Sequence, residues 1–471
     1  MKNKIIYNYL GKVLIAFSFL LIAPIIVTTI YRENPLPFAI PLVLSLLIGM
    51  LLISIKREKA NLYAKDGFII VSLSWLLISL IGALPFWING DASFIDSIFE
   101  SVSGFTTTGA SIFEDVEILN KGILFWRCYS HFIGGMGVLA FVMAIIPMSK
   151  HDRSMHVLKA EMPGPTISKL VPGLKKTLIY LYIIYIGLTL MEMILLIFGK
   201  INFFDSLLLS MSTAGTGGFS VLNSGIASYG TYNQLVIALF MFLFGINFNI
   251  YFLILMKEFK NSFKSEELKA YIIIYIFAVA IIIFNTYTLF SSLKEGMVSA
   301  IFHVSSVMTS TGFSIGDINI YPTSCRILVL CLMLISACSG STCGGFKISR
   351  LLICLKKIKR DFMKAIHPNC VHSITFDGKK VEEQVVESTC SYLFLYTFFI
   401  IIIMFIVSFD KVNLSQTINA VLSTFANVGI GFEISNFAIF NDLSTFVLSI
   451  GMLLGRLEIF PLIVLFSDFK K

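Results

Sequence analysis

A chain of 471 residues with 56% hydrophobic and only 14% charged residues has an unusual composition, because soluble proteins carry roughly 25% charged residues. This composition and the mean hydropathy of +0.86 exclude a water-soluble globular protein and indicate a polytopic membrane protein. The net charge of +8 does not indicate a nucleic-acid-binding protein, since positive residues in a membrane protein are first of all a topology signal.

The chain opens with a basic and then apolar segment that could be taken for a secretory signal. No small-residue cleavage site follows, so we expect a first membrane span that stays in the protein. Nine further apolar runs are close to the length of about 20 residues that crosses a bilayer. The ten predicted spans are 10–30, 37–55, 68–88, 122–147, 177–199, 232–256, 270–293, 325–352, 386–409 and 443–467.

Lysine and arginine residues mark every second connection between these spans. They precede the first span, follow the second, fourth, sixth and eighth spans, and end the chain. Because positively charged loops stay on the cytoplasmic side, both termini are expected in the cytoplasm. The alternation would fail if one span were miscounted, so it supports the count of ten.

Four of the outward connections contain a short apolar stretch that ends in a cluster of small residues. A helix of about 13 residues spans roughly 20 Å, which is too short to cross the membrane. The clusters are SVSGFTTTGAS (101–111), SMSTAGTGGFS (210–220), SSVMTSTGFS (305–314) and STFANVGIGFE (423–433). The glycines on which we align them, about a hundred residues apart, are Gly109, Gly217, Gly312 and Gly429.

The depth of these clusters restricts what their backbone can do. Irregular backbone inside a membrane is tolerated only where protein buries it or where it lines a water-filled cavity. Four glycine-containing segments around one axis can form a ring of carbonyls that replaces the hydration shell of a monovalent cation. The alternative, small residues that pack helices together, is our interpretation of GGMG at 134–137, which lies inside a full span.

The repeated order of span, short helix, cluster and span predicts the fold. We expect an all-α polytopic membrane protein with four pseudo-symmetric helix–pore-helix–helix repeats around one central pore, plus two extra N-terminal transmembrane helices. The predicted units are 1–66 for the two N-terminal helices and 67–160, 161–265, 266–375 and 376–471 for the four pore repeats.

Other polar residues give no sign of a disulfide framework or a metal centre. The eight cysteines lie mostly within apolar spans without CxxC spacing, so reduced, buried thiols are expected. His303 is interpreted as a packed residue and not as a proton carrier. The acidic residues Glu114, Asp115 and Glu117 after the first cluster either raise the local cation concentration or form an ordinary solvated face.

Taken together, these motifs resemble the Trk/Ktr/HKT superfamily of potassium transporters, and within it the TrkH-type subunit. The resemblance covers essentially the whole chain. It rests on SGFTTTGAS, TGGFS, TSTGFS and NVGIG in this order, on SGSTCGGFK at 339–347, and on GRLEIFP at 455–461. The two spans before the first repeat favour the TrkH type over the shorter Ktr form.

The resemblance implies an ion filter that receives one glycine from each repeat. Glycine at all four positions implies selectivity for potassium over sodium, since family members with serine at the first position tend to pass sodium. The implied K+-coordinating residues are Thr107, Thr108, Gly109, Gly215, Thr216, Gly217, Ser310, Thr311, Gly312, Asn427, Val428 and Gly429.

A second implied element is a gate within the eighth span, where the glycines of SGSTCGG interrupt the helix. In the family this segment is an intramembrane loop that obstructs the pore; here Cys343 stands where relatives often carry glycine. A phosphate-binding loop is a poor alternative, because the GxxxxGK[ST] spacing is missing. Arg456 is interpreted as a barrier to cations beside the loop, with an ion pair to Glu192 as the alternative. The implied gate residues are Gly340, Ser341, Thr342, Gly344, Gly345 and Arg456.

The sequence therefore predicts potassium uptake across the inner (cytoplasmic) membrane and no enzymatic activity. It does not decide between passive flux and symport. The alternative is a proton- or sodium-coupled transporter of another small solute, which typically has inverted repeats and intramembrane carboxylates. The repeats here are parallel and the spans hold few acids.

The resemblance also implies partners. These are a TrkA-like cytoplasmic nucleotide-binding regulatory subunit and a second copy of the chain in a homodimer, both within a lipid bilayer and without nucleic acid. The chain has no GxGxxG unit of its own, and its basic segments 149–176 and 347–384 offer docking surface. Potassium is the expected transported and bound ion, and no covalently bound cofactor is expected.

Overall fold

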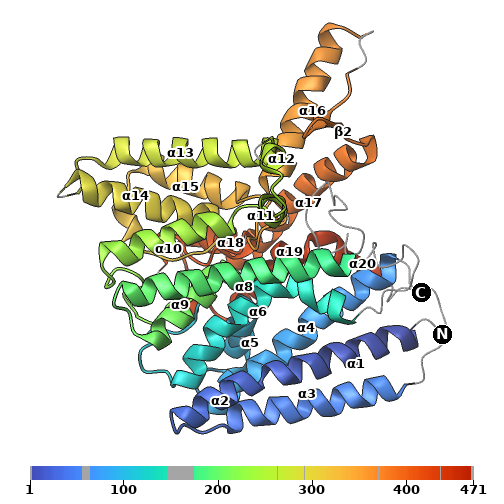
Figure 1. Cartoon of the computed structure of the whole chain (residues 1–471), viewed down its shortest axis with the longest axis vertical. Helices are drawn as coiled ribbons and strands as arrows, with labels where there is room; N and C mark the ends of the chain where they lie inside the picture. Colours follow the sequence, from blue (N-terminus) through green and yellow to red (C-terminus); the bar gives the residue numbers. More distant parts are fainter. Residues whose placement is uncertain are drawn as a thin grey trace.

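The computed structural model is almost entirely helical and describes residues 3–55, 64–145, 174–262, 264–290, 292–368, 372–434 and 436–467. An N-terminal hairpin is followed by four units of similar construction, as the sequence predicts. Helix α1 (Asn3–Leu20) begins and α20 (Ile459–Ser467) ends on the same side of the molecule (Figure 1).

The N-terminal hairpin consists of α1, α2 (Ile22–Ile30) and α3 (Leu36–Ser54). A Cβ placed on Gly11 of α1 would lie 2.7 Å from the carbonyl oxygen of Gly49 in α3. Small residues at such a crossing let two membrane helices approach closely. The hairpin packs along one side of the first unit (Figure 1).

Each unit contains a long helix, a short helix, an irregular segment and a returning helix. The first unit comprises α4 (Ala64–Asn89), α5 (Phe94–Phe105) and α6 (Lys121–Ile145). The second comprises α8 (Leu174–Phe198), α9 (Phe203–Gly215), α10 (Thr231–Phe244) and α11 (Phe248–Leu255), followed by α12 (Phe259–Ser262). The third comprises α13 (Glu266–Thr286), α14 (Leu293–Met308), η1 (Ile318–Ile320), α15 (Thr323–Ile335) and α16 (Ile348–Ile366). After the antiparallel strands β1 (Thr375–Phe376) and β2 (Lys379–Lys380), the fourth comprises α17 (Glu383–Val407), α18 (Leu414–Phe425), η2 (Phe437–Ile439), α19 (Asp442–Leu457) and α20.

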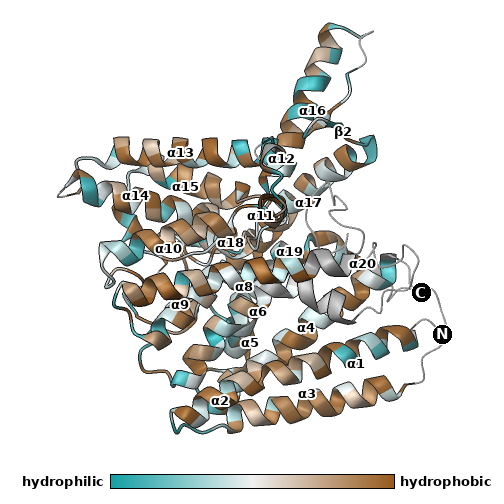
Figure 2. Ribbon diagram, viewed as in Figure 1, coloured by the Kyte–Doolittle hydropathy of each residue, from teal (hydrophilic) through white to brown (hydrophobic). Residues whose placement is uncertain are grey.

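Several of these helices have the length and composition of membrane spans. Among the described residues, six helices qualify, and two further pairs qualify if each pair is counted as one broken span. Figure 2 shows apolar residues along most of α1, α3 and α13, and polar residues gathered on the protruding helix α16. The chain is therefore a multi-pass membrane protein, as its composition predicts.

The predicted spans at 232–256 and 443–467 are not continuous helices. The first is bent by 89° between α10 and α11, and the second by 114° between α19 and α20. At the first bend the N–H of Phe248 donates to the carbonyl of Gly340, in the third unit, at 3.1 Å. A bond between units thus satisfies a backbone group that the broken helix leaves free. At the second bend Glu458 has a left-handed φ of 60°.

The four short helices α5, α9, α14 and α18 all begin in the same way. The side chain before each helix accepts a hydrogen bond from the backbone N–H three residues later, which satisfies one of the free N–H groups at a helix start. The pairs are Ser93 and Asp96, Asn202 and Asp205, Ser292 and Glu295, and Asn413 and Gln416. The helices contain between 12 and 16 residues, so they are too short to cross the membrane, as predicted.

Candidate functional site

Each short helix runs into an irregular turn, and the four turns share one backbone conformation. One residue has a left-handed φ between 52° and 56°, and the glycine two positions later has a φ between 79° and 81°. Glycine adopts this second conformation readily because it has no Cβ. The residues are Thr107 and Gly109, Thr216 and Gly218, Ser310 and Gly312, and Asn427 and Gly429.

A hydrogen bond repeated in all four turns folds the chain back onto its helix. The N–H of the middle residue donates to the carbonyl of a serine five positions earlier, at 2.8–2.9 Å. The pairs are Thr108 and Ser103, Gly217 and Ser212, Thr311 and Ser306, and Val428 and Ser423. The same bond and the same φ values make the four turns structurally equivalent.

The sequence alignment of the second turn is wrong by one residue. Gly218, and not Gly217, carries the φ of 80°, while Gly215 still belongs to α9. Two adjacent glycines made the choice ambiguous. The Gly-Phe-Ser triplet shared by 218–220 and 312–314 is the signal that gives the correct register.

The four turns lie side by side in a closed ring. A Cβ placed on the positive-φ glycine of each turn would lie less than 3.0 Å from a carbonyl oxygen of the next turn. The contacts run from Gly109 to Gly217, from Gly218 to Thr311, from Gly312 to Val428 and from Gly429 to Thr108. The last contact returns to the first turn, where the Asn427 side chain also donates to the Thr108 hydroxyl at 2.9 Å. The order is therefore cyclic, and a side chain at any of the four glycines would push two turns apart.

The segments that follow the turns join the units in the same cyclic order. At least one backbone N–H crosses each of the four boundaries at 2.8–3.0 Å. The donors and acceptors are Val116 to Asn223, Ile226 to Ser314, Glu433 to Asn319, and Phe437 to Ser111. The fourfold arrangement thus extends beyond the turns.

Acidic residues on these segments have structural partners. Asp115 accepts a hydrogen bond from the Asn223 side chain at 2.7 Å, and Glu117 accepts one from the Asn223 N–H at 2.9 Å. The bonds from Asn223 and from the N–H of Glu117 lower the pKa of Asp115. Glu433 lies 3.6 Å from Arg326 in an ion pair between the third and fourth units. These carboxylates join neighbouring units, in addition to any effect on local cation concentration.

Glycines of the returning helices bring them against the ends of the short helices. A Cβ on Gly134 would lie less than 3.0 Å from the carbonyl oxygen of Phe105 in α5, and one on Gly135 would lie 2.7 Å from the last residue of α9. Gly455 of α19 approaches the carbonyl of Phe425 in α18 in the same way. This geometry supports the packing interpretation of GGMG.

We expect Gly134→Ala to lower the melting temperature of the purified protein in detergent. The added methyl group would displace the backbone of α5, and such overpacking typically costs about 1–3 kcal/mol. Gly187→Ala in α8 is the matched control, because nothing lies within 4 Å of its Cβ position. Equal melting temperatures of the two variants would contradict the close packing.

The interruption of the eighth span, between α15 and α16, places a loop of residues 336–347 directly against the ring. The N–H of Gly344 donates to the hydroxyl of Ser310 at 2.8 Å. A Cβ on Gly344 would lie 2.7 Å from the Cβ of Asn427. Ser310 and Asn427 are the left-handed residues of the third and fourth turns, so the loop contacts two turns at once.

Hydrogen bonds hold the loop at both of its ends. The Ser336 hydroxyl donates to the carbonyl of Gly344 at 2.7 Å. One carboxylate oxygen of Glu267, in α13, accepts from the N–H groups of Ser339 and Ser349 at 2.7 and 3.1 Å.

The glycines of the loop allow its sharp turns. Gly340 and Gly345 have φ values of 69° and 76°, which favour glycine. Between them, the Ser341 hydroxyl donates to the carbonyl of Cys338 at 2.6 Å.

Two cations contact residues of this loop, the half-buried Arg456 and the buried Lys347. The Arg456 guanidinium donates to the carbonyl of Thr342 at 2.6 Å and to that of Gly134 at 3.1 Å. Within the described residues it forms no ion pair with Glu192. Lys347, which the sequence did not single out, donates from its amine to the carbonyl of Cys343 and is 2% exposed. Two positive charges thus contact adjacent carbonyls of the loop, those of Thr342 and Cys343.

The remaining polar residues of the sequence prediction have packing roles. His303 is buried and shares hydrogen bonds with the hydroxyls of Tyr321 at 2.8 Å and Ser299 at 3.2 Å, which confirms its interpretation as a packed residue. The seven cysteines in the described part of the chain are free thiols, and most are buried. Cys370 and most of the basic segment 149–176 lie outside the described residues.

Comparisons with known proteins agree over almost the whole chain. Residues 37–470 match the TrkH family, described as cation transport proteins. The chain is 32% identical to the Trk system potassium uptake protein TrkG of Escherichia coli (strain K12), over 99% of this chain and 98% of that protein. It is also 32% identical to the Trk system potassium uptake protein TrkH of Salmonella typhimurium, over 99% of each. The crystal structure of the potassium transporter TrkH from Vibrio parahaemolyticus matches with a TM-score of 0.89 at 28% identity, over 99% of this chain and 98% of that one.

Proposed function

This chain belongs to the TrkH family of cation transport proteins, and we propose that it takes up potassium ions through the ring of four turns. The family consists of transporters and not of enzymes. The observation that carries the proposal is the cyclic contact between the turns, with a glycine at each point of closest approach. The relatives named as potassium uptake proteins support potassium as the ion.

Backbone carbonyls of the turns are the proposed ion ligands. A ring of carbonyl oxygens replaces the hydration shell of a monovalent cation, and glycine leaves the centre free of side chains. The proposed residues, with the second turn in its corrected register, are Thr107, Thr108, Gly109, Thr216, Gly217, Gly218, Ser310, Thr311, Gly312, Asn427, Val428 and Gly429.

The loop of residues 336–347 is the proposed gate. It contacts the third and fourth turns through Gly344, and Arg456 and Lys347 bring positive charge against it. Positive charge in a low-dielectric environment repels a passing cation strongly. Movement of the loop and of these two charges away from the turns would open the path for the ion.

The proposed setting is the inner membrane, with both termini in the cytoplasm. The basic helix α16 and the β1–β2 hairpin protrude from the helical body at the top of the view in Figure 2. They offer a surface to a TrkA-like nucleotide-binding regulatory subunit. A homodimer, as expected for this type of transporter, completes the proposed assembly.

Ion flux into liposomes tests the function directly. We expect liposomes that contain the purified chain to take up potassium at least about ten times faster than sodium under equal gradients, since a ring of carbonyls discriminates by ion size and field strength. Liposomes without protein are the control.

Equal flux of the two ions would contradict potassium selectivity. Proton or sodium flux that depends on another solute would instead support the coupled-transporter alternative. Growth of a potassium-uptake-deficient bacterium on low potassium, with and without this chain, is the corresponding test in cells.

A further inference from the structure

A buried ion pair lies behind the first two turns. The Nε atom of Arg127, in α6, is 2.7 Å from a carboxylate oxygen of Glu100, in α5, and the two side chains are 2% and 0% exposed. Removal of two charges from water is costly, and such a pair is stable only when further hydrogen bonds complete both groups. Both groups make such bonds, and their partners lie in the segments that follow the first and second turns of the ring.

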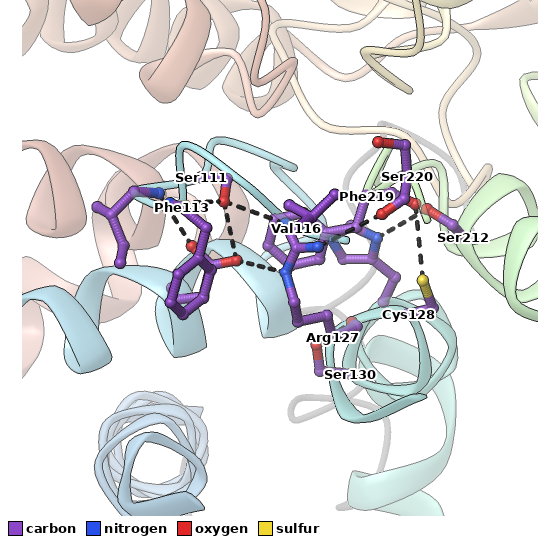
Figure 3. A network of polar contacts seen from close by, with 12 residues as sticks. Ser111, Phe113, Val116, Arg127, Cys128, Ser130, Ser212, Phe219 and Ser220 are labelled. Atoms are coloured by element: carbon purple, nitrogen blue, oxygen red, sulfur yellow. Dashed lines mark hydrogen bonds and ion pairs between the residues drawn. The ribbon is translucent and has the colours of Figure 1, made fainter. Parts of the chain in front are cut away.

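Arg127 contacts the segments that leave two different turns. One Nη atom donates to the hydroxyl of Ser111 at 3.0 Å, and the other donates to the carbonyl of Ser220 at 3.4 Å. The guanidinium carbon lies 4.2 Å from the centre of the Phe219 ring, in cation–π contact. Figure 3 shows Arg127 with Ser111 on one side and Phe219 and Ser220 on the other. One side chain thus spans the boundary between the first and second units.

Glu100 also holds the first of these segments. Its two oxygens accept hydrogen bonds from the Ser111 hydroxyl at 3.2 Å and from the N–H of the next residue at 3.1 Å. Ser111 follows Gly109 by two positions, and Phe219 directly follows Gly218. The ion pair therefore acts within two residues of two ring glycines.

This charged contact is specific to the first unit. Glu100 lies three positions before the serine that accepts the turn hydrogen bond. The equivalent residues in the other units are Leu209, His303 and Ala420. The ring has a fourfold backbone, but among the described residues only the boundary between its first and second turns is held by a buried ion pair.

We propose that Glu100 and Arg127 are positioning residues that hold the first and second turns at the separation needed to discriminate potassium from sodium. The proposal rests on the proposed function. A guanidinium presents its donors in a rigid planar fork, so the distance between its partners is set by covalent geometry. A binding site keeps its geometry only when the surrounding groups are themselves held in place.

Two variants test the proposal without leaving an isolated buried charge. Arg127→Lys keeps the positive charge but loses the fork, and Glu100→Gln/Arg127→Met removes both charges together. Arg360→Lys is the matched control, because Arg360, on the protruding helix α16, forms an ion pair with Glu383 of α17, away from the ring. For each purified protein, the potassium-to-sodium flux ratio in liposomes and the melting temperature in detergent are measured.

We expect the flux ratio of both Arg127 variants to fall at least about tenfold, mainly through faster sodium flux, while Arg360→Lys keeps the wild-type ratio. A melting temperature within a few degrees of wild type would separate this effect from unfolding. A wild-type flux ratio in either variant, in folded protein, would overturn the positioning role. If the wild-type protein itself does not discriminate the two ions, the proposed function is wrong. This result differs from failure of the positioning role, in which the wild type and the variants discriminate the two ions equally well.

Discussion

Gly218→Ala is expected to reduce selective potassium flux at least about a hundredfold. Gly218 has a φ of 80°, and its Cβ position overlaps the carbonyl oxygen of Thr311 in the next turn. A residue other than glycine in such a conformation carries about 1–3 kcal/mol of strain, and the neighbouring backbone has no room to move without opening the ring. Flux of potassium and sodium into liposomes measures the effect.

The adjacent Gly217 provides an internal comparison. Its φ is not positive, and the nearest atoms to its Cβ position belong to the His131 ring, which is a side chain and not backbone. Gly217→Ala is therefore expected to impair flux through a clash with the His131 ring, and the second change His131→Ala is expected to restore the flux.

Addition of His131→Ala to Gly218→Ala is expected to leave its flux as low as that of Gly218→Ala alone. His131→Ala alone is the control for the loss of the imidazole. Rescue of Gly218→Ala by His131→Ala, or an inactive Gly217→Ala/His131→Ala protein, would show that the register of the second turn is not the one described.

The comparison of these two glycines also shows where sequence reasoning stops. The repeat and the four short helices were predictable, because each short apolar stretch is too short to cross the membrane and ends in a cluster of small residues that contains glycine. The register of TGGFS was not predictable from spacing alone, since the unit length varies. The φ of 80° and the cyclic contact with Thr311 separate Gly218 from Gly217, and the Gly-Phe-Ser triplet shared with 312–314 is the sequence signal that gives this register.

The bends in the returning helices were missed for a different reason. Apolar composition over 232–256 satisfies the length of a span. Its local break signals, Gly245 at the end of α10 and Asn247 as the N-cap of α11, were given less weight than this composition. The break at Phe248 is stabilised by a carbonyl of the loop in another unit, Gly340, which is 92 positions away in the chain. Tertiary hydrogen bonds of this kind leave no local pattern.

The buried ion pair left a signal that was overlooked. Arg127 lies within the predicted span 122–147, and a charge inside a span is rare and costly, so it calls for a partner. Glu100, on the short helix of the same unit, was the nearest carboxylate available on a helix packed against it. The pair could have been predicted from the expectation that the short helix and the returning helix of one unit pack against each other.

Replacement of Arg456 by glutamine is expected to raise potassium flux through the isolated chain about tenfold or more. The guanidinium holds the loop through Thr342 and the first unit through Gly134, at 2.6 and 3.1 Å. Its loss removes both the hydrogen bonds that restrain the loop and a positive charge that repels cations where the dielectric constant is low. The initial rate of potassium uptake into liposomes, without any regulatory subunit, is the measurement.

Two further variants separate the charge of Arg456 from its hydrogen bonds. Arg456→Lys keeps the charge but has no planar fork to reach both carbonyls at once, so a flux between those of wild type and Arg456→Gln is expected. Arg360→Gln, on the protruding helix α16, removes an arginine that does not contact the loop and is expected to conduct like wild type. If Arg456→Gln conducts no faster than wild type while its potassium-to-sodium ratio is unchanged, the loop and Arg456 do not limit the flux, and the proposed gate lies elsewhere in the chain.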